Sequence, residues 1–176
     1  MLWFFKRKKA MGNVFSDNVN FVNRNAGNPQ QQQGSSREIL LASNTGGAGP
    51  LPITDCALNA PVSVVSTSID TSRLRRVTNF LLFTAQISLP AGAVAALSFE
   101  ILRSVDGSGV KVGSTYTFEA TAAAALSQSF SFQFADEDLE GDNYTYSVQL
   151  SPNSSVSGTA GTTINNATLT VIAVRS

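Results

Sequence analysis

Apolar and polar residues alternate along most of the chain with a period of two. In the clearest stretch, Phe130, Phe132 and Phe134 are separated by serine and glutamine, and Tyr144 and Tyr146 repeat the pattern. Successive side chains of a β-strand point to opposite faces of a sheet. This spacing is therefore typical of antiparallel strands with one buried and one solvated face. We expect the three phenylalanine rings to be buried.

Eight segments of this kind are separated by short stretches rich in Gly, Pro, Asn and Asp. The predicted strands are 37–43, 62–70, 77–89, 94–106, 110–120, 126–134, 143–151 and 162–174. The Asp-Gly pair within 106–109 predicts a hairpin turn, because such residues tolerate positive φ. The alanine-rich segment 120–127 is too short for a stable helix. We expect it to be a crossover between strands.

These strands predict an all-β fold, namely an eight-stranded antiparallel jelly-roll sandwich with an extended N-terminal arm. An immunoglobulin-like sandwich is the alternative. That fold usually holds a buried Trp, whereas the single Trp of this chain is Trp3, far from the strands. We expect two parts, an arm over 1–36 and a jelly-roll domain over 37–176.

The predicted arm contains a strand pattern in a composition that favours a flexible tether. Asn, Gln, Gly and Ser offer too little apolar area to offset the entropy of ordering the segment alone. Val19 and Phe21 nevertheless alternate with asparagines. Such a segment is suited to pair with an exposed sheet edge of another copy. The predicted self-assembly interface consists of Phe15, Val19, Phe21, Val22, Arg37, Ile39 and Leu41.

Charge is distributed unevenly, although the chain is neutral overall. Residues 1–37 hold six basic residues and one acidic residue, a net charge of +5, and residues 38–176 hold six basic and eleven acidic residues, a net charge of −5. Opposite charges favour a head-to-tail order between copies. A head-to-tail contact repeats without closing and gives filaments. The predicted partner is therefore the chain itself.

Composition argues against catalysis and against nucleic-acid binding. The chain has no histidine, and its Ser, Asp and Lys residues follow no known catalytic spacing. We expect no enzyme activity, no cofactor and no catalytic or metal-binding residues. Basic residues at 6–9 and 73–76 resemble phosphate contacts, but the acidic body opposes nucleic acid. No apolar run is long enough for a transmembrane helix.

Two further features have more than one interpretation. The acidic run 135–143 predicts a solvated loop between strands, with a Ca²⁺ loop as the alternative. Cys56 is the single cysteine, so an internal disulfide is excluded. Its apolar neighbours favour a buried thiol over one paired with another chain. We accordingly expect an assembly that survives reducing agents.

Several phrases of the sequence carry a family resemblance. They are REILLASNTGGAGPLPIT, VVSTSIDTSRLRR followed by NFLLFTAQI, FSFQFADEDLEGDNYTYSVQL and TINNATLTVIAV. Together they resemble a family of small jelly-roll subunits from endospore-forming Firmicutes, akin to the subunits of endospore appendages. The resemblance implies an extracellular fibre on the cell or spore surface, polymerised through an N-terminal connector and strand pairing. Such proteins often have several cysteines that cross-link subunits. This chain differs from them, because it has only Cys56.

Two other function classes are compatible with the predicted fold. A viral or capsid-like shell protein would combine a jelly roll with a basic internal arm. A carbohydrate-binding β-sandwich would need exposed aromatic side chains on one face, for which Tyr144 and Tyr146 are the nearest candidates. Filaments, shells or dispersed monomers in electron micrographs would separate the three hypotheses.

Overall fold

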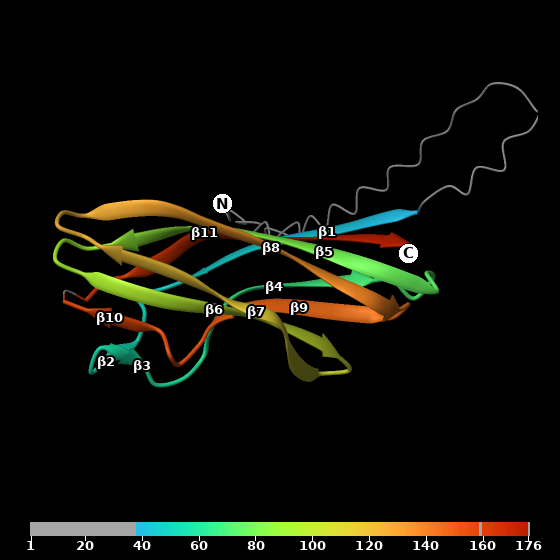
Figure 1. Cartoon of the computed structure of the whole chain (residues 1–176), viewed down its shortest axis with the longest axis horizontal. Coiled ribbons are helices and arrows are strands. Elements are labelled where there is room, and N and C mark those ends of the chain that lie inside the picture. Colours follow the sequence, from blue (N-terminus) through green and yellow to red (C-terminus); the bar gives the residue numbers. More distant parts are fainter. Residues whose placement is uncertain (1–37, 159, 176) are drawn as a thin grey trace, which may run out of the picture.

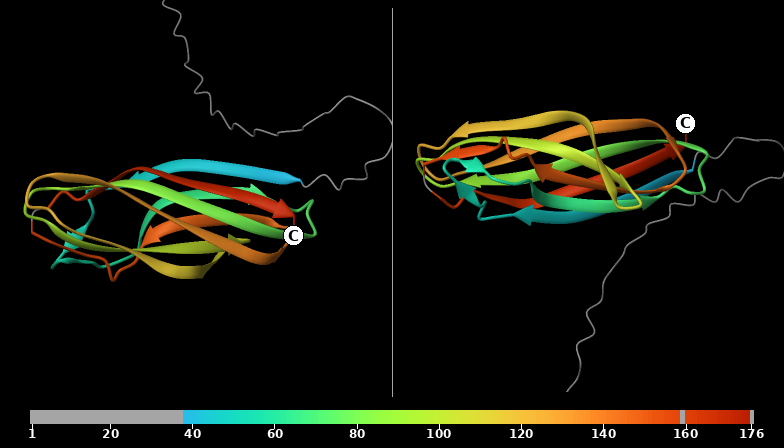
Figure 2. Two further views of the ribbon diagram at one scale, coloured as in Figure 1. Left: turned by 45° about the horizontal axis from the view of Figure 1, so that its top comes forward. Right: turned by 90° about the horizontal axis from the view of Figure 1, so that it is seen from below.

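The computed structural model describes residues 38–158 and 160–175, which form two packed antiparallel β-sheets (Figure 1). Figure 2 shows the two sheets as layers of a sandwich. The strands are β1 (Ile39–Ala48), β2 (Ile53–Thr54), β3 (Ala57–Leu58), β4 (Val62–Asp70), β5 (Arg76–Leu89), β6 (Val94–Val105), β7 (Ser108–Thr121), β8 (Leu126–Glu140), β9 (Asn143–Leu150), β10 (Ser155–Ser157) and β11 (Thr163–Arg175).

The strand order is that of a jelly roll. One sheet has four strands in the order β1-β11-β5-β8. The other has seven, with β7, β6, β9 and β4 as its long members and β10, β3 and β2 extending it beside β6. Consecutive long strands lie in alternate sheets, except for the β6–β7 hairpin. The predicted eight-stranded antiparallel sandwich is thus confirmed, with three short strands added.

The core lies between the sheets and follows the alternation of the sequence. In β5 every second residue from Val77 to Leu89 is buried. Phe83 of the four-stranded sheet and Phe99 of the seven-stranded sheet are fully buried, with ring centroids 5.6 Å apart. Both rings are supplied by strands at the centre of their sheets.

Both predicted connections are confirmed. In the β6–β7 turn, Asp106 and Gly107 have φ of 53° and 87°, and Val105 pairs with Ser108. This is a two-residue hairpin of the kind that Asp-Gly favours. The segment between Thr121 and Leu126 crosses from the seven-stranded to the four-stranded sheet, as expected.

The acidic run is not the predicted loop, because β8 extends through it to Glu140. Strand pairing with β5 continues as far as Arg76 and Glu140, with an irregularity between the pairs of Val77 and Asn79. Asp138, at φ 56°, lies at that irregularity. The insertion places Asp136 and Leu139 inside the sandwich, and this burial is what keeps an acidic segment in the sheet.

Two burial predictions also need correction. Phe130, Phe132 and Phe134 point inward but are half-buried, because β8 is the last strand of its sheet. Cys56 is exposed rather than buried. It lies in the two-residue turn between β2 and β3, at φ 66°, while Leu58, two residues further on, is buried in the core.

Candidate self-assembly surfaces

Large apolar side chains are exposed on the outer face of the four-stranded sheet. Their exposed fractions are 60% for Ile39, 46% for Leu41, 43% for Phe80 and 41% for Leu82. Strand register places Leu41, Ile172, Phe80 and Ala135 in one row across β1, β11, β5 and β8. We call the patch formed by Ile39, Leu41, Phe80, Leu82, Ile172 and Val174 the apolar face.

The apolar face occupies one end of the sheet. Toward the other end the outward side chains are hydroxyls and amides, which hydrogen-bond to one another across strands. The hydroxyls of Ser43 and Thr170 lie 2.9 Å apart, and those of Ser88 and Ser127 lie 3.1 Å apart. A contiguous exposed apolar patch with a polar rim is characteristic of an interaction surface.

The four-stranded sheet also has two open edges among the described residues. β1 pairs with β11 and β8 pairs with β5, and neither strand has a second partner there. Unpaired N–H and C=O groups at a sheet edge form a template for another strand. At fifteen residues, β8 offers the longer edge.

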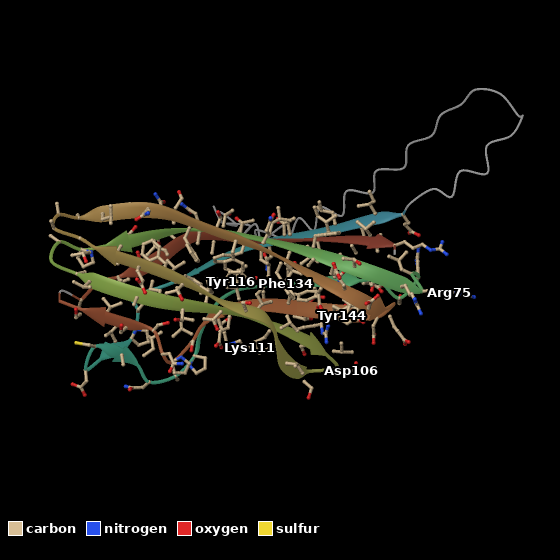
Figure 3. All side chains as sticks on the ribbon, viewed as in Figure 1. Arg75, Asp106, Lys111, Tyr116, Phe134 and Tyr144 are labelled. Carbon is tan, nitrogen blue, oxygen red and sulfur yellow. The ribbon has the colours of Figure 1, made fainter. Side chains whose placement is uncertain are left out.

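Aromatic rings lie along the side of the sandwich where β7 and β8 face each other. Phe132 stacks on Tyr116 of β7, with centroids 3.9 Å apart and planes 5° apart, and also on Phe83 at 4.8 Å. Phe130 stacks on Phe99 at 5.0 Å. Figure 3 shows Tyr116 and Phe134 near the middle of the molecule's length. The two sheets meet here through rings, because β7 and β8 form no strand pair.

A buried polar cluster joins the sheets beside these rings. Arg103 of β6 donates from Nη1 to both carboxylate oxygens of Asp136, at 2.9 and 3.0 Å. The hydroxyl of Tyr146 donates to Asp136 Oδ2 at 2.8 Å and accepts from Asn79 Nδ2 at 2.9 Å. Burial raises the pKa of Tyr146 well above its usual range, so the phenol keeps the proton that it donates.

Sequence reasoning missed this cluster, although one signal was present. Asp136 continues the inward series of Phe130, Phe132 and Phe134 at the same spacing of two. A carboxylate at a core position needs a charged partner. Arg103 also lies inside a predicted strand. Asp136 was not predicted to be buried, because its neighbours in the sequence are acidic residues typical of a solvated loop.

The remaining acids of the run lie at the exposed end of β8. Glu137, Asp138 and Glu140 are exposed, and Glu140 pairs in register with Arg76. Arg75 lies at the same end of the molecule (Figure 3). Within 38–158 and 160–175, no three acidic, cysteine or histidine side chains are placed to hold a metal ion.

The predicted site residues fall into three groups. Ile39 and Leu41 belong to the apolar face. Tyr144 and Tyr146 are buried, which contradicts their use as an exposed carbohydrate platform. Outside the described residues lie the predicted arm over 1–36, with Phe15, Val19, Phe21 and Val22, and also Arg37.

Comparison with protein families identifies one match. The sequence pattern of a family described as a domain of unknown function (DUF4489) matches residues 39–174. The chain belongs to this family. No curated protein matches the chain. Among the residues that the structure describes, there is no helix long and apolar enough to cross a membrane.

Several solved structures are similar to this member of the DUF4489 family. The tripod from the baseplate of bacteriophage Tuc2009 has 12% identity and a TM-score of 0.42, and the match covers 100% of this chain and 83% of that one. The structure of infectious bursal disease virus Gx strain has 12% identity and a TM-score of 0.42, and the match covers 77% of this chain and 33% of that one. The globular domain of zebrafish complement 1qA protein has 9% identity and a TM-score of 0.33, and the match covers 77% of this chain and 95% of that one. TM-scores this low carry no argument about function.

Proposed function

We propose that this protein is a structural subunit that assembles head to tail into a filament, in which the N-terminal arm of one copy engages the body of the next. The observation that carries the proposal is the apolar face, with Ile39, Leu41, Phe80 and Leu82 each more than 40% exposed. Fully burying an exposed side chain of this size contributes about 1.5–3 kcal/mol. A second copy that covers the face gains part of this free energy at each side chain.

The arm is attached at the corner of this face. Glu38 alone separates residues 1–37 from β1, which supplies Ile39 and Leu41. Their net charge of +5 is opposite to the −5 of residues 38–176. Attraction between the arm of one copy and the body of another favours a head-to-tail contact that repeats from copy to copy over a closed dimer.

The proposal includes a location and a role. The resemblance to endospore appendage subunits supports an extracellular fibre on the cell or spore surface. Its subunits are held by non-covalent contacts and have no catalytic function. Capsid-like shell formation, which also fits a basic arm, is a distinct outcome of the same imaging experiment.

Electron microscopy and sedimentation of the purified full-length chain test the proposal. We expect filaments from the unaltered protein, and loss of pelletable polymer when Phe80→Thr and Leu82→Thr are combined. Val110→Thr is the control, because Val110 is an apolar residue on β7 of the other sheet and is even more exposed, at 58%. Closed shells, dispersed monomers or undiminished filaments from the double variant would each overturn the proposal.

A further inference from the structure

The edge of β8 that has no second strand partner among the described residues has a side-chain pattern that selects what can pair with it. One backbone carbonyl of β8, that of Gln133, accepts a hydrogen bond from the Tyr116 hydroxyl at 3.4 Å. Its inward residues Phe130, Phe132 and Phe134 are half-buried, and its outward residues between them are polar and exposed. A strand added at this edge would place alternate side chains against the half-buried rings and the others beside polar neighbours. The edge therefore fits a segment with apolar residues at every second position and polar residues between.

The segment 14–22 of this chain comes near that pattern. Phe15, Val19 and Phe21 share one face of an extended strand with Asp17. Ser16, Asn18 and Asn20 share the other face, with Val14 and Val22 at its two ends. The edge of β1 fits less well, because Ile39 and Leu41 make its outward face apolar. We propose that the edge of β8 is the acceptor for segment 14–22 of a neighbouring copy. This inference rests on the proposed function and specifies its contact.

Charge sets the direction of pairing. Glu137, Asp138 and Glu140 are exposed at the C-terminal end of β8, and the basic residues 6–9 precede the segment. Lys9 lies six residues before Phe15, and Glu140 lies six residues after Phe134. The irregularity in β8 adds one residue between Phe134 and Glu140, so in an antiparallel pair with Phe15 beside Phe134 the basic residues 6–9 begin one residue beyond Glu140, at the acidic end of β8.

The same direction favours a neighbouring copy over the chain's own arm. Strand order and register place the start of β1 at the same end of the sandwich as Glu140, as Figure 1 shows. Antiparallel pairing takes residue 22 to the opposite end, beside Ser127. The return to Glu38 would cover about 47 Å, whereas sixteen residues reach about 53 Å only when fully extended. A neighbour's arm avoids this constraint.

Photo-cross-linking of the full-length polymer tests the acceptor directly. Phe15 is replaced by p-benzoylphenylalanine, and unlabelled and nitrogen-15-labelled chains are mixed before assembly. We expect cross-links from position 15 to residues 130–136, joining labelled to unlabelled chains. Cross-links to β1 or β11, cross-links confined to one chain, or none to β8 would overturn the inference while leaving filament formation itself intact.

Charge reversal gives a second measurement on the same assembly. Glu137→Lys with Glu140→Lys should abolish pelletable polymer, and adding Lys8→Glu with Lys9→Glu should restore it. Glu119→Lys is the control, because Glu119 is exposed on β7 of the other sheet. Failure of the arm reversals to restore polymer would overturn the β8 contact. Absence of polymer from the unaltered protein would instead overturn the proposed function, and this inference with it.

Discussion

The outer faces of the two sheets have the same strand geometry and opposite chemistry. On the seven-stranded sheet, outward hydroxyls hydrogen-bond across strands, with Ser68 and Thr145 at 2.8 Å and Ser66 and Ser147 at 3.0 Å. On the four-stranded sheet, the corresponding outward positions at one end are held by the apolar face. One face satisfies many of its polar side chains within the subunit, with Val94 exposed beside them, and the other leaves a contiguous apolar patch exposed.

The sequence marks this difference where alternation fails. An antiparallel strand with one solvated face alternates apolar and polar residues. The run Phe80, Leu81, Leu82 and Phe83 breaks the rule, and so does Val171 to Val174 on the neighbouring strand. Register brings these runs together with Leu41. Consecutive apolar residues in an otherwise alternating strand thus indicate an exposed apolar patch rather than a deeper core.

The two outer faces keep their positions only while the interior holds the sheets together. Among the polar residues between the sheets, we expect substitution of Asp136 to lower stability most. Asp136→Ala leaves Arg103 without its carboxylate. We expect a loss of about 3 kcal/mol in the free energy of unfolding, the low end for a broken buried pair, because the Arg103 side chain is 28% exposed. Urea denaturation measures the loss.

Glu137→Ala is the control for this prediction, since Glu137 is exposed. It should change stability by less than about 0.5 kcal/mol. Equal effects of the two variants would show that the buried cluster does not hold the sheets together.

For β8, the sequence pattern predicts the strand and its inward side but not how deeply that side is buried. Alternation depends on neighbouring residues, so it predicts a strand and its inward side, as it does for Phe132. Whether that side is fully covered depends on the strand's place in the sheet, and β8 lies at an edge. The partner of Asp136, Arg103, is 33 residues away on a different strand. No local pattern contains that pairing.

Tyr146→Phe removes one hydroxyl from the buried cluster without emptying the core. It leaves one bond fewer at Asp136 and at Asn79, and we expect a cost of about 1–2 kcal/mol near neutral pH. Burial raises the pKa of Tyr146 in the folded protein. Its stabilising contribution is therefore complete below the unfolded value near 10 and is lost as pH rises above it, because the unfolded chain releases the proton more readily.

Thermal denaturation across alkaline pH tests this prediction. The unaltered protein should lose stability above about pH 10 more steeply than the Tyr146→Phe variant. Tyr144 and Tyr116 also have raised pKa values through burial, so a residual slope should persist in the variant. Identical slopes would show that Tyr146 titrates alike in the folded and unfolded states.

The polar outer face should be insensitive to loss of its ion pair. Lys111 Nζ donates to Glu100 Oε1 at 2.8 Å and to Thr115 Oγ1 at 2.9 Å. Glu100→Gln should lower the free energy of unfolding by no more than about 0.5 kcal/mol, because Lys111 is well exposed to solvent. It should leave polymer unchanged in pelleting assays. A loss of polymer equal to that of the Phe80 and Leu82 variants would place an interface on both faces.

The smallest effect is expected at Cys56, which lies apart from the apolar face on the exposed turn between β2 and β3. Cys56→Ser should change the free energy of unfolding by less than about 0.5 kcal/mol, as for other exposed substitutions. Strand pairing and apolar burial need no thiol, so filaments of the unaltered protein should withstand reducing agent at neutral pH. Electron microscopy before and after treatment, beside the Cys56→Ser variant, measures this. Exposure leaves the thiol accessible to a neighbouring copy, so dispersal of filaments by reductant alone would assign the cohesion to a disulfide between subunits instead of to the apolar face.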